Sequence, residues 1–281
     1  MQQPESPAPS PGPSPGAIIG AASGDPEFRP VKSAYRALDV LEALAFRPAT
    51  LSELSRLLDI PKSSLHGLVR TLTERGWIAP ADGSTRFRLG LRALQVGARF
   101  VEEDEAVARV APTLDRLVAS TGETVQHGRL DGDQVVYLAK RETAHQVRII
   151  SDVGARLPAH ATALGKALLA ARDDDTVVGL LRQPLASLTS HTKTDLDALL
   201  GDLERARSRG YAVDDGEAAD GLRCFAVVVP PRRTGERGLP TDAVSVSVPA
   251  FRLDAVREDR LVAALLDAQL RLGGLPAPFR G

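Results

Sequence analysis

The segment DIPKSSLHGLVR, residues 59–70, contains Ser, His and Arg side chains that can donate hydrogen bonds, spaced between apolar residues. Pro61 suits the first position of a helix, where its missing N–H costs nothing. In a helix that begins there, the apolar residues form a stripe along one face. This stripe consists of Leu65, Leu68, Val69 and Leu72. The opposite face carries small, hydrogen-bonding or basic residues: Ser63, His66, Gly67 and Arg70. Such groups donate to base edges and phosphates and permit close approach. The segment therefore predicts a recognition helix that enters the DNA major groove by its N-terminal end.

The elements around this segment are those of a winged helix-turn-helix domain, which we expect at residues 31–90. Apolar residues recur at helical spacing over 33–46. The sequence TLSE at 50–53 has the capping-box form and predicts a second helix that ends near Leu58. The Asp-Gly pair within residues 81–90 predicts a small hairpin after the recognition helix.

A polar helix on an unrelated small domain is the alternative interpretation. Three features together disfavour it: the capped preceding helix, the Asp-Gly hairpin with Arg86 and Arg88, and the charge of residues 29–100, which hold twelve Lys or Arg and six Asp or Glu. We therefore expect four side chains to face bases or adjacent phosphates: Ser63, Ser64, His66 and Arg70. Backbone or minor-groove contacts are expected from Arg36, Lys62, Arg86 and Arg88. Because so small a domain reads few base pairs, the prediction includes a palindromic double-stranded operator and a dimer.

The rest of the chain has the composition of an ordinary globular protein. Its 281 residues suffice for two domains, and the apolar share of 43% is near the globular average. The Pro-rich residues 1–30 are expected to be a disordered arm. The single cysteine, Cys224, excludes an internal disulfide and fits a reducing compartment. Because the sequence has neither a bilayer-length apolar run nor a signal-peptide pattern, it predicts a cytoplasmic protein without membrane association.

Residues 91–104 are expected to form a linker helix that pairs with its counterpart, and residues 105–281 an α+β domain. Strands are predicted at 135–139, 147–150, 224–229 and 244–248. Helices are predicted at 162–171, 194–209 and 255–272. Strands and helices alternate without a strict βαβ series, which indicates a mixed α/β sensor domain.

The strand sequence VSVSV alternates valine with serine. Period two places the valines on the core face and the Ser245 and Ser247 hydroxyls together on the other face. A strand face that carries serines is most often exposed to solvent. Alternatively, this face forms the floor of a pocket for a ligand that carries oxygen atoms.

A predicted helix start near Ala161 or Thr162 offers backbone N–H groups and partial positive charge to an anion. We hypothesise that the ligand is a small organic acid. Its carboxylate would lie near residues 162–165, and its hydroxyl or keto oxygens near Ser245 and Ser247.

Two further residues have competing interpretations. Asp214 either binds a ligand hydroxyl or caps the turn in AVDDGE. Lys166 is expected to be a solvated helix residue, because ALGKA lacks the spaced glycine and the Ser or Thr of a phosphate-binding loop.

An enzyme is the main alternative to a regulator. His160, Cys224 and Asp214 have the residue types of a base, a nucleophile and an orienting acid for acyl transfer or hydrolysis. However, Cys224 opens a strongly apolar strand, where a lone cysteine usually behaves as a small hydrophobe. The histidines are scattered without metal-ligand spacing, so neither a metal site nor a cofactor is predicted.

Several long stretches resemble the IclR-type transcriptional regulators. Similar to the DNA-binding half of that family are RALDVLEALA, LSELSRLLDIPKSSLHGLVRTLTERGW and FRLG. Similar to its effector-sensing half are GETVQHGRLDGDQVVYLAKR, GARLPAHATALGKALLA, RSRGYAVDDGEAADGLRCFAVVV and VSVSVPAFR. The resemblance runs from about residue 31 to 272 in the family's order.

This resemblance implies a repressor that forms a dimer of dimers, with a winged helix-turn-helix, a linker helix and a GAF/PAS-like effector domain. It implies effector contacts from Ile149 (an apolar wall), Ala163, Leu164, Asp214, Cys224, Ser245 and Ser247. One departure is Gly67, where the family commonly has an arginine. Glycine there weakens the helix by up to about 1 kcal/mol relative to alanine. A pure interaction module with a vestigial DNA-binding domain therefore remains an alternative.

Overall fold

The computed structural model describes residues 31–81, 83–142, 152–231 and 238–273. The chain divides into two compact units, residues 1–100 and 101–281. The expected arm at 1–30 and the expected strand at 147–150, which includes Ile149, lie outside the described residues.

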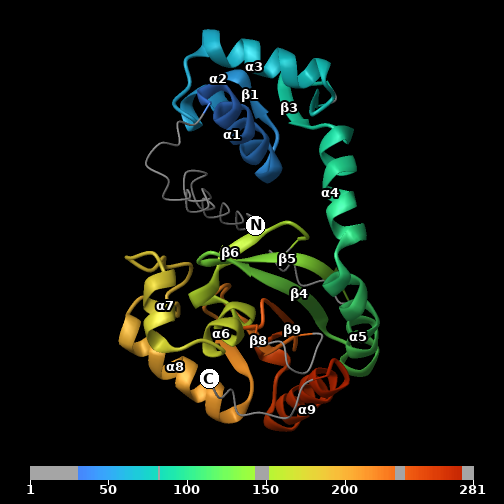
Figure 1. The fold of residues 1–281 in the computed structure, drawn as a ribbon, viewed down its shortest axis with the longest axis vertical. Helices are drawn as coiled ribbons and strands as arrows, with labels where there is room; N and C mark the ends of the chain where they lie inside the picture. The colour runs from blue at the N-terminus through green and yellow to red at the C-terminus, as the bar shows by residue number, and fades with distance from the viewer. Residues whose placement is uncertain (1–30, 82, 143–151, 232–237, 274–281) are drawn as a thin grey trace, which may run out of the picture. The chain divides into compact units, whose positions relative to one another are not determined.

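The N-terminal unit has the winged helix-turn-helix order of elements (Figure 1). They are α1 (Lys32–Phe46), β1 (Ala49–Thr50), α2 (Leu51–Leu57), α3 (Lys62–Glu74), β2 (Ile78–Pro80), β3 (Arg86–Leu89) and α4 (Leu91–Glu103). The strands form an antiparallel sheet in the order β1-β3-β2. The predicted hairpin, β2–β3, is thus confirmed, and β1 adds a third strand that the sequence did not predict.

The predicted apolar stripe anchors α3 in the core of this unit. Leu65, Val69 and Leu72 are buried, and Leu68 is half-buried. Pro61 lies at the N-cap, so α3 begins one residue later than predicted.

The turn between α2 and α3 is tight. Asp59 has a φ of 49°, a left-handed conformation that aspartate tolerates better than most residues. The Ser55 hydroxyl closes the turn by donating to the Ile60 carbonyl at 2.7 Å. At the other end of α2, the predicted capping box between Thr50 and Glu53 is confirmed.

The C-terminal unit is an antiparallel sheet with helices on both faces. Its helices are α5 (Glu105–Thr121), α6 (Ala163–Ala170), α7 (Asp174–Leu180), α8 (Leu196–Arg209) and α9 (Ala255–Arg271), with 3-10 turns η2 (Ala159–Ala161) and η3 (Ala250–Arg252). Its strands are β4 (Thr124–Asp131), β5 (Gln134–Arg141), β6 (Arg156–Pro158), β7 (Ala212–Asp215), β8 (Leu222–Val228) and β9 (Asp242–Pro249). The strand order is β6-β5-β4-β9-β8-β7. The predicted strands at β5, β8 and β9 and the predicted helices α6, α8 and α9 are confirmed, whereas β4, β6, β7 and α7 were not predicted.

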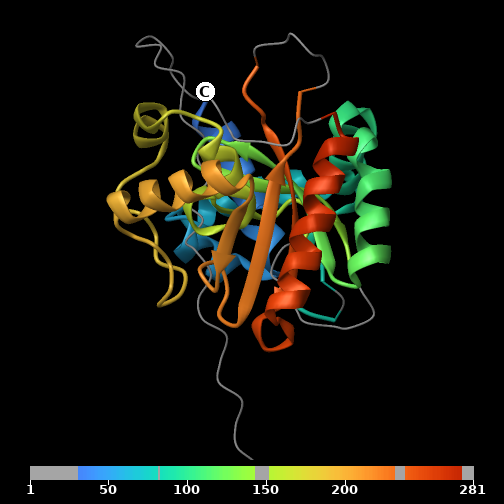
Figure 2. The same ribbon diagram turned by 90° about the horizontal axis from the view of Figure 1, so that it is seen from below.

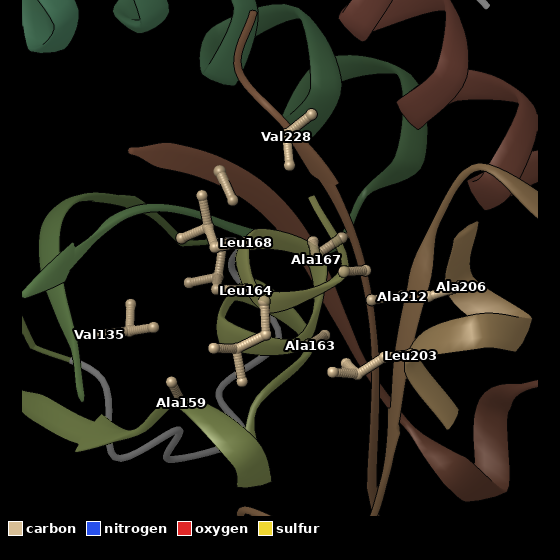
Figure 3. Close-up of a cluster of buried hydrophobic side chains, with 14 of the residues drawn as sticks. Val135, Ala159, Ala163, Leu164, Ala167, Leu168, Leu203, Ala206, Ala212 and Val228 are labelled. Carbon is tan, nitrogen blue, oxygen red and sulfur yellow. The ribbon is translucent and has the colours of Figure 1, made fainter. Parts of the chain in front are cut away.

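Two apolar cores lie on opposite faces of this sheet. On one face Val244, Val246 and Val248 pack against α5 and α9, which run side by side in Figure 2. On the other face α6 packs against the sheet and α8, and Figure 3 shows Leu164 and Leu168 of α6 in this second core. Ser245 and Ser247, which alternate with these valines along β9, therefore face α6.

Candidate functional site

The face of α3 opposite its buried stripe is exposed, as predicted. The residues Lys62, Ser63, Ser64, His66 and Arg70 are all exposed, and this face contains no acidic residue before Glu74. Arg70 Nε lies 3.0 Å from Glu74 Oε1 in an exposed pair one turn apart. At Gly67 an added Cβ would meet nothing within 4 Å, so packing does not require glycine at this position.

The remaining predicted DNA contacts occupy different environments. Arg88 of β3 is exposed, and Arg36 of α1 is half-buried. The guanidinium of Arg86 donates to the Pro48 carbonyl at 2.6 Å and to Glu53 Oε1 at 2.7 Å. Arg86 therefore ties the wing to the start of α2, whereas Arg88 is the more exposed of the two wing arginines.

The predicted effector residues in the described ranges converge on the α6 face of the second sheet. Asp214 of β7 pairs with Cys224 of β8, and Cys224 pairs with Ser247 of β9, so these three form a row across three strands. Ala163 and Leu164 begin α6 and are buried against this face. Residues far apart in the chain are thus brought together, as predicted, except for Ile149, which lies outside the described residues.

The serine face is enclosed, so the interpretation of a solvated face is wrong. Ser245 and Ser247 are each 2% exposed. Both hydroxyls donate to the same atom, Gln126 Oε1, at 2.9 Å. Gln126 was not predicted from the sequence; it lies in the stretch TVQHG of β4, which pairs with β9.

Asp214 caps the β7–β8 turn. Its Oδ1 accepts from the Glu217 N–H at 2.7 Å and from the Ala218 N–H at 3.2 Å. Burial raises the pKa of Asp214 to about 6, although these two N–H bonds act in the opposite direction. The turn-capping interpretation is confirmed, and binding of a ligand hydroxyl by the same carboxyl group stays a prediction.

Tyr137 of β5 is a second polar residue in this region that was not predicted from the sequence. It is 6% exposed and belongs to the same core as Leu164. Burial raises its pKa, and the negative charge that Asp214 and Cys224 carry when ionised would raise it further. This phenol thus stays protonated beside the predicted effector residues.

Lys166 is buried, so the prediction of a solvated lysine is wrong. It is 1% exposed, and its ammonium group lies 2.7 Å from Asp202 Oδ2 and 2.5 Å from Glu217 Oε1. Lys193 contacts the same Glu217 oxygen at 2.8 Å. Burial alone would raise the pKa of Asp202, but the charge of Lys166 holds it below the ordinary value. We call Lys166, Lys193, Asp202 and Glu217 the buried ionic cluster.

The start of α6 is fixed by local contacts. The Thr162 hydroxyl accepts from the Gly165 N–H at 3.0 Å and caps the helix. A Cβ at Gly165 would lie 2.1 Å from the Ala159 carbonyl oxygen, so only glycine permits η2 to pack this closely. The helix therefore begins at Ala163, near the predicted position, with Leu164 directed into the core (Figure 3).

Two residues of the enzyme alternative are in environments that do not favour the proposed chemistry. His160 Nε2 lies 2.9 Å from the Ala186 carbonyl oxygen, and burial lowers the pKa of this histidine. Burial also raises the pKa of the Cys224 thiol, which opposes formation of a nucleophilic thiolate. Among the described residues, no group of three His, Cys, Asp or Glu side chains is placed to hold a metal ion.

Comparison with known proteins identifies the family. Residues 33–81 match the IclR helix-turn-helix domain, and residues 98–272 match the bacterial transcriptional regulator IclR C-terminal domain. The chain belongs to the IclR family of transcriptional regulators. It is thus a DNA-binding regulator with the two domain types that the sequence predicted.

Individual IclR-family proteins are similar over most of their length. The chain is 36% identical over 251 residues to the HTH-type transcriptional regulator BhcR of Paracoccus denitrificans (strain Pd 1222), covering 88% of each chain. It is 31% identical over 264 residues to the transcriptional repressor IclR of Escherichia coli (strain K12), covering 91% of this chain and 95% of that one. The crystal structure of an IclR transcriptional regulator from Alicyclobacillus acidocaldarius has a TM-score of 0.75 at 27% identity, covering 87% of this chain and 98% of the other.

These relatives are transcriptional regulators by name, which favours regulation over the enzyme alternative. In the described part of the IclR-family chain, no helix has the length and apolar content needed to cross a bilayer.

Proposed function

We propose that this IclR-family protein is a repressor that binds a palindromic operator and is controlled by a small organic acid. The observation that carries the DNA half is the exposed face of α3, where small and basic side chains stand opposite the buried Leu65, Val69 and Leu72. On this proposal Ser63, Ser64, His66 and Arg70 contact bases or adjacent phosphates. Arg36, Lys62 and Arg88 contact the DNA backbone, and Arg86 holds the wing in place beside them.

The proposed assembly is a dimer, and two dimers associate. Large apolar side chains of α4 are exposed in the single chain: Leu91 (78%), Leu94 (67%), Val96 (55%) and Phe100 (54%). Exposed apolar side chains grouped in this way are typical of a protein interface. Pairing of α4 with the α4 of a second copy would cover them and present two recognition helices to the two halves of a palindrome.

The proposed effector is an organic acid that binds between α6 and the sheet. Ala163 and Leu164 lie at the N-terminal end of α6, which favours negative charge. Ser245, Ser247 and Cys224 supply polar groups opposite this helix start. The protonated Tyr137 and the cap residue Asp214 offer further hydrogen bonds to hydroxyl or keto oxygens.

The DNA half is tested by fluorescence anisotropy with duplexes from upstream of the protein's own gene and of its neighbours. Arg70→Ala should weaken specific binding by about 1–3 kcal/mol if Arg70 contacts a base. Glu74→Ala is the matched control, because it removes the partner of Arg70 but leaves the guanidinium free to bind DNA. Equal affinity of wild type and Arg70→Ala would remove Arg70 from the interface.

The effector half is tested by calorimetric titration with pyruvate, lactate and the neutral analogue pyruvamide. We expect the two acids to bind and pyruvamide to bind at least about tenfold more weakly, since it lacks the charge that the helix start favours. The double variant Ser245→Ala/Ser247→Ala should weaken binding of both acids. Tight binding of pyruvamide alone would contradict the proposal.

A further inference from the structure

Arg129 of β4 joins the α4–α5 junction to the sheet. Asp104, the residue between α4 and α5, caps α5 by accepting from the Ala106 and Val107 N–H groups at 3.0 Å. The Arg129 guanidinium donates to both Asp104 oxygens, at 2.5 and 3.1 Å. The cap of α5 is therefore fixed to β4 by two charge-assisted hydrogen bonds.

The same guanidinium also binds a second carboxylate. Arg129 donates to both oxygens of Asp242, at 2.7 and 2.8 Å, and His127 Nε2 lies 2.8 Å from the second of them. Asp242 is the first residue of β9 and is 3% exposed. Burial alone would raise the pKa of Asp242, but bonds from Arg129 and His127 hold it well below the ordinary value. Arg129 on β4 thus binds two carboxylates, Asp104 at the start of α5 and Asp242 on β9, and connects these three elements.

These two strands also carry the proposed effector contacts. On β9 the hydroxyls of Ser245 and Ser247 bind Gln126 of β4, only three residues from Arg129. Arg129 is directly opposite Asp242 in the strand register, and Gln126 is opposite Ser245. A shift of β4 relative to β9 caused by a ligand at the serines would therefore change the geometry at Arg129.

Leu164 provides a second route to the same strand. The backbone of β4 passes so close to α6 at Gly128 that an added Cβ would lie 3.0 Å from Leu164 Cδ1 and 2.7 Å from Val135 Cγ1. The register of β4 and β5 also shifts between His127 and Gly128. Gly128 thus lies between a predicted effector residue and the arginine that holds the junction.

We propose that Arg129 is a positioning residue that couples effector occupancy to DNA binding by setting the geometry of the α4–α5 junction. The inference rests on the proposed function, because it requires that the protein binds both an operator and an acid. A contact whose free energy differs between the two states can carry such coupling. A guanidinium shared by two carboxylates meets this need, because a shift of either carboxylate misaligns its fork.

The test compares wild type with Arg129→Lys and Asp104→Asn. Lysine keeps the charge but cannot bind two carboxylates bidentately, and asparagine keeps the α5 cap but loses the ion pair. Arg156→Lys is the matched control, because Arg156 also joins a strand to a carboxylate, Asp131, at 2.6 Å, but at the β6 edge of the sheet. Hydrogen exchange of the full chain should show faster exchange at residues 99–110 in Arg129→Lys and Asp104→Asn but not in Arg156→Lys, and unchanged exchange there in Arg129→Lys would overturn the inference.

The decisive measurement is the ratio of operator dissociation constants with and without saturating pyruvate or lactate. In wild type we expect a ratio of about fivefold or more, which should fall below about twofold in Arg129→Lys and Asp104→Asn. Both variants should still bind operator and acid separately, which a merely structural defect would not allow.

The possible failures are distinguishable. If Arg129→Lys keeps the wild-type ratio of operator dissociation constants, the inference is overturned but the proposed function is not. A wild-type ratio of one, or no binding of operator or acid by wild type, would overturn the proposed function and the inference with it.

Discussion

Helices α3 and α6 differ in how well their own sequences predict which of their residues are buried. In α3, of thirteen residues, only Leu65, Val69 and Leu72 are buried, whereas all eight residues of α6 are buried. Each helix carries one lysine, yet Lys62 is exposed and Lys166 is 1% exposed. A helix with one buried face has an environment that its own periodicity predicts. A helix enclosed on all sides depends on partners elsewhere in the chain.

The two lysines give the largest expected difference. Lys166→Ala should destabilise the protein by about 3 kcal/mol, because the buried Asp202 and Glu217 would lose their closest cation and keep only the half-buried Lys193 as a shared partner. Lys62→Ala should change stability by less than about 0.5 kcal/mol and should instead weaken DNA binding. Urea unfolding followed by far-UV circular dichroism measures the stabilities. The contrast between the helices would fail if both variants had the stability of wild type.

Asp214, on a strand that packs against α6, allows a test by pH. Because its folded pKa is raised to about 6, the folded protein retains a proton between about pH 4 and 6 that the unfolded chain releases. This group therefore favours folding at low pH, and its contribution is lost as the pH rises through 6. Asp214→Asn, which keeps the turn cap, should be more stable than wild type by about 1–3 kcal/mol at pH 7.5 and by almost nothing at pH 4.

Urea midpoints measured from pH 4 to 8 check this expectation. Asp195→Asn is the control, because it makes the same substitution at an exposed helix cap. An Asp214→Asn curve parallel to that of wild type would show that the carboxyl group titrates normally.

The two threonine caps give the smallest expected effects. Thr50 caps α2 at a half-buried position, and Thr162 caps α6 at a position that is 2% exposed. Thr50→Ala should cost about 1 kcal/mol, and Thr162→Ala about 2 kcal/mol because the Gly165 N–H would lose its partner away from water. Serine at either position should restore most of the loss in urea unfolding. Equal losses at the two sites would show that burial of the cap is unimportant.

Most of the fold followed from local patterns. The capping box, the apolar stripe of α3, the Asp-Gly hairpin and the valine–serine alternation of β9 were all predicted and found. Strand β4 was missed because five of its eight residues are buried in succession, so it lacks the alternation that identifies a half-exposed strand. Short β1 and β7 offered too few residues for a period.

The candidate sites differ in the same way. On α3 the contacts come from one segment, so residue types and a helical period sufficed to select them. Around α6 the valine–serine alternation singled out Ser245 and Ser247, but only the family resemblance favoured a pocket there and joined Cys224 and Asp214 to it. Neither predicted Gln126 or Tyr137, because their proximity depends on strand pairing.

Local periodicity was enough to predict most of the elements, their order and the exposed polar face of α3, because helix and strand periods are properties of neighbouring residues. The burial of Lys166 between Asp202 and Glu217 depends instead on the complete fold, since these carboxylates lie 36 and 51 residues away. The complete fold also lets both serines share Gln126 and lets Arg129 join Asp104 to Asp242. The free energy of a buried charge or hydroxyl depends on the partners that the fold brings into contact with it. Residues adjacent in the chain do not specify these partners.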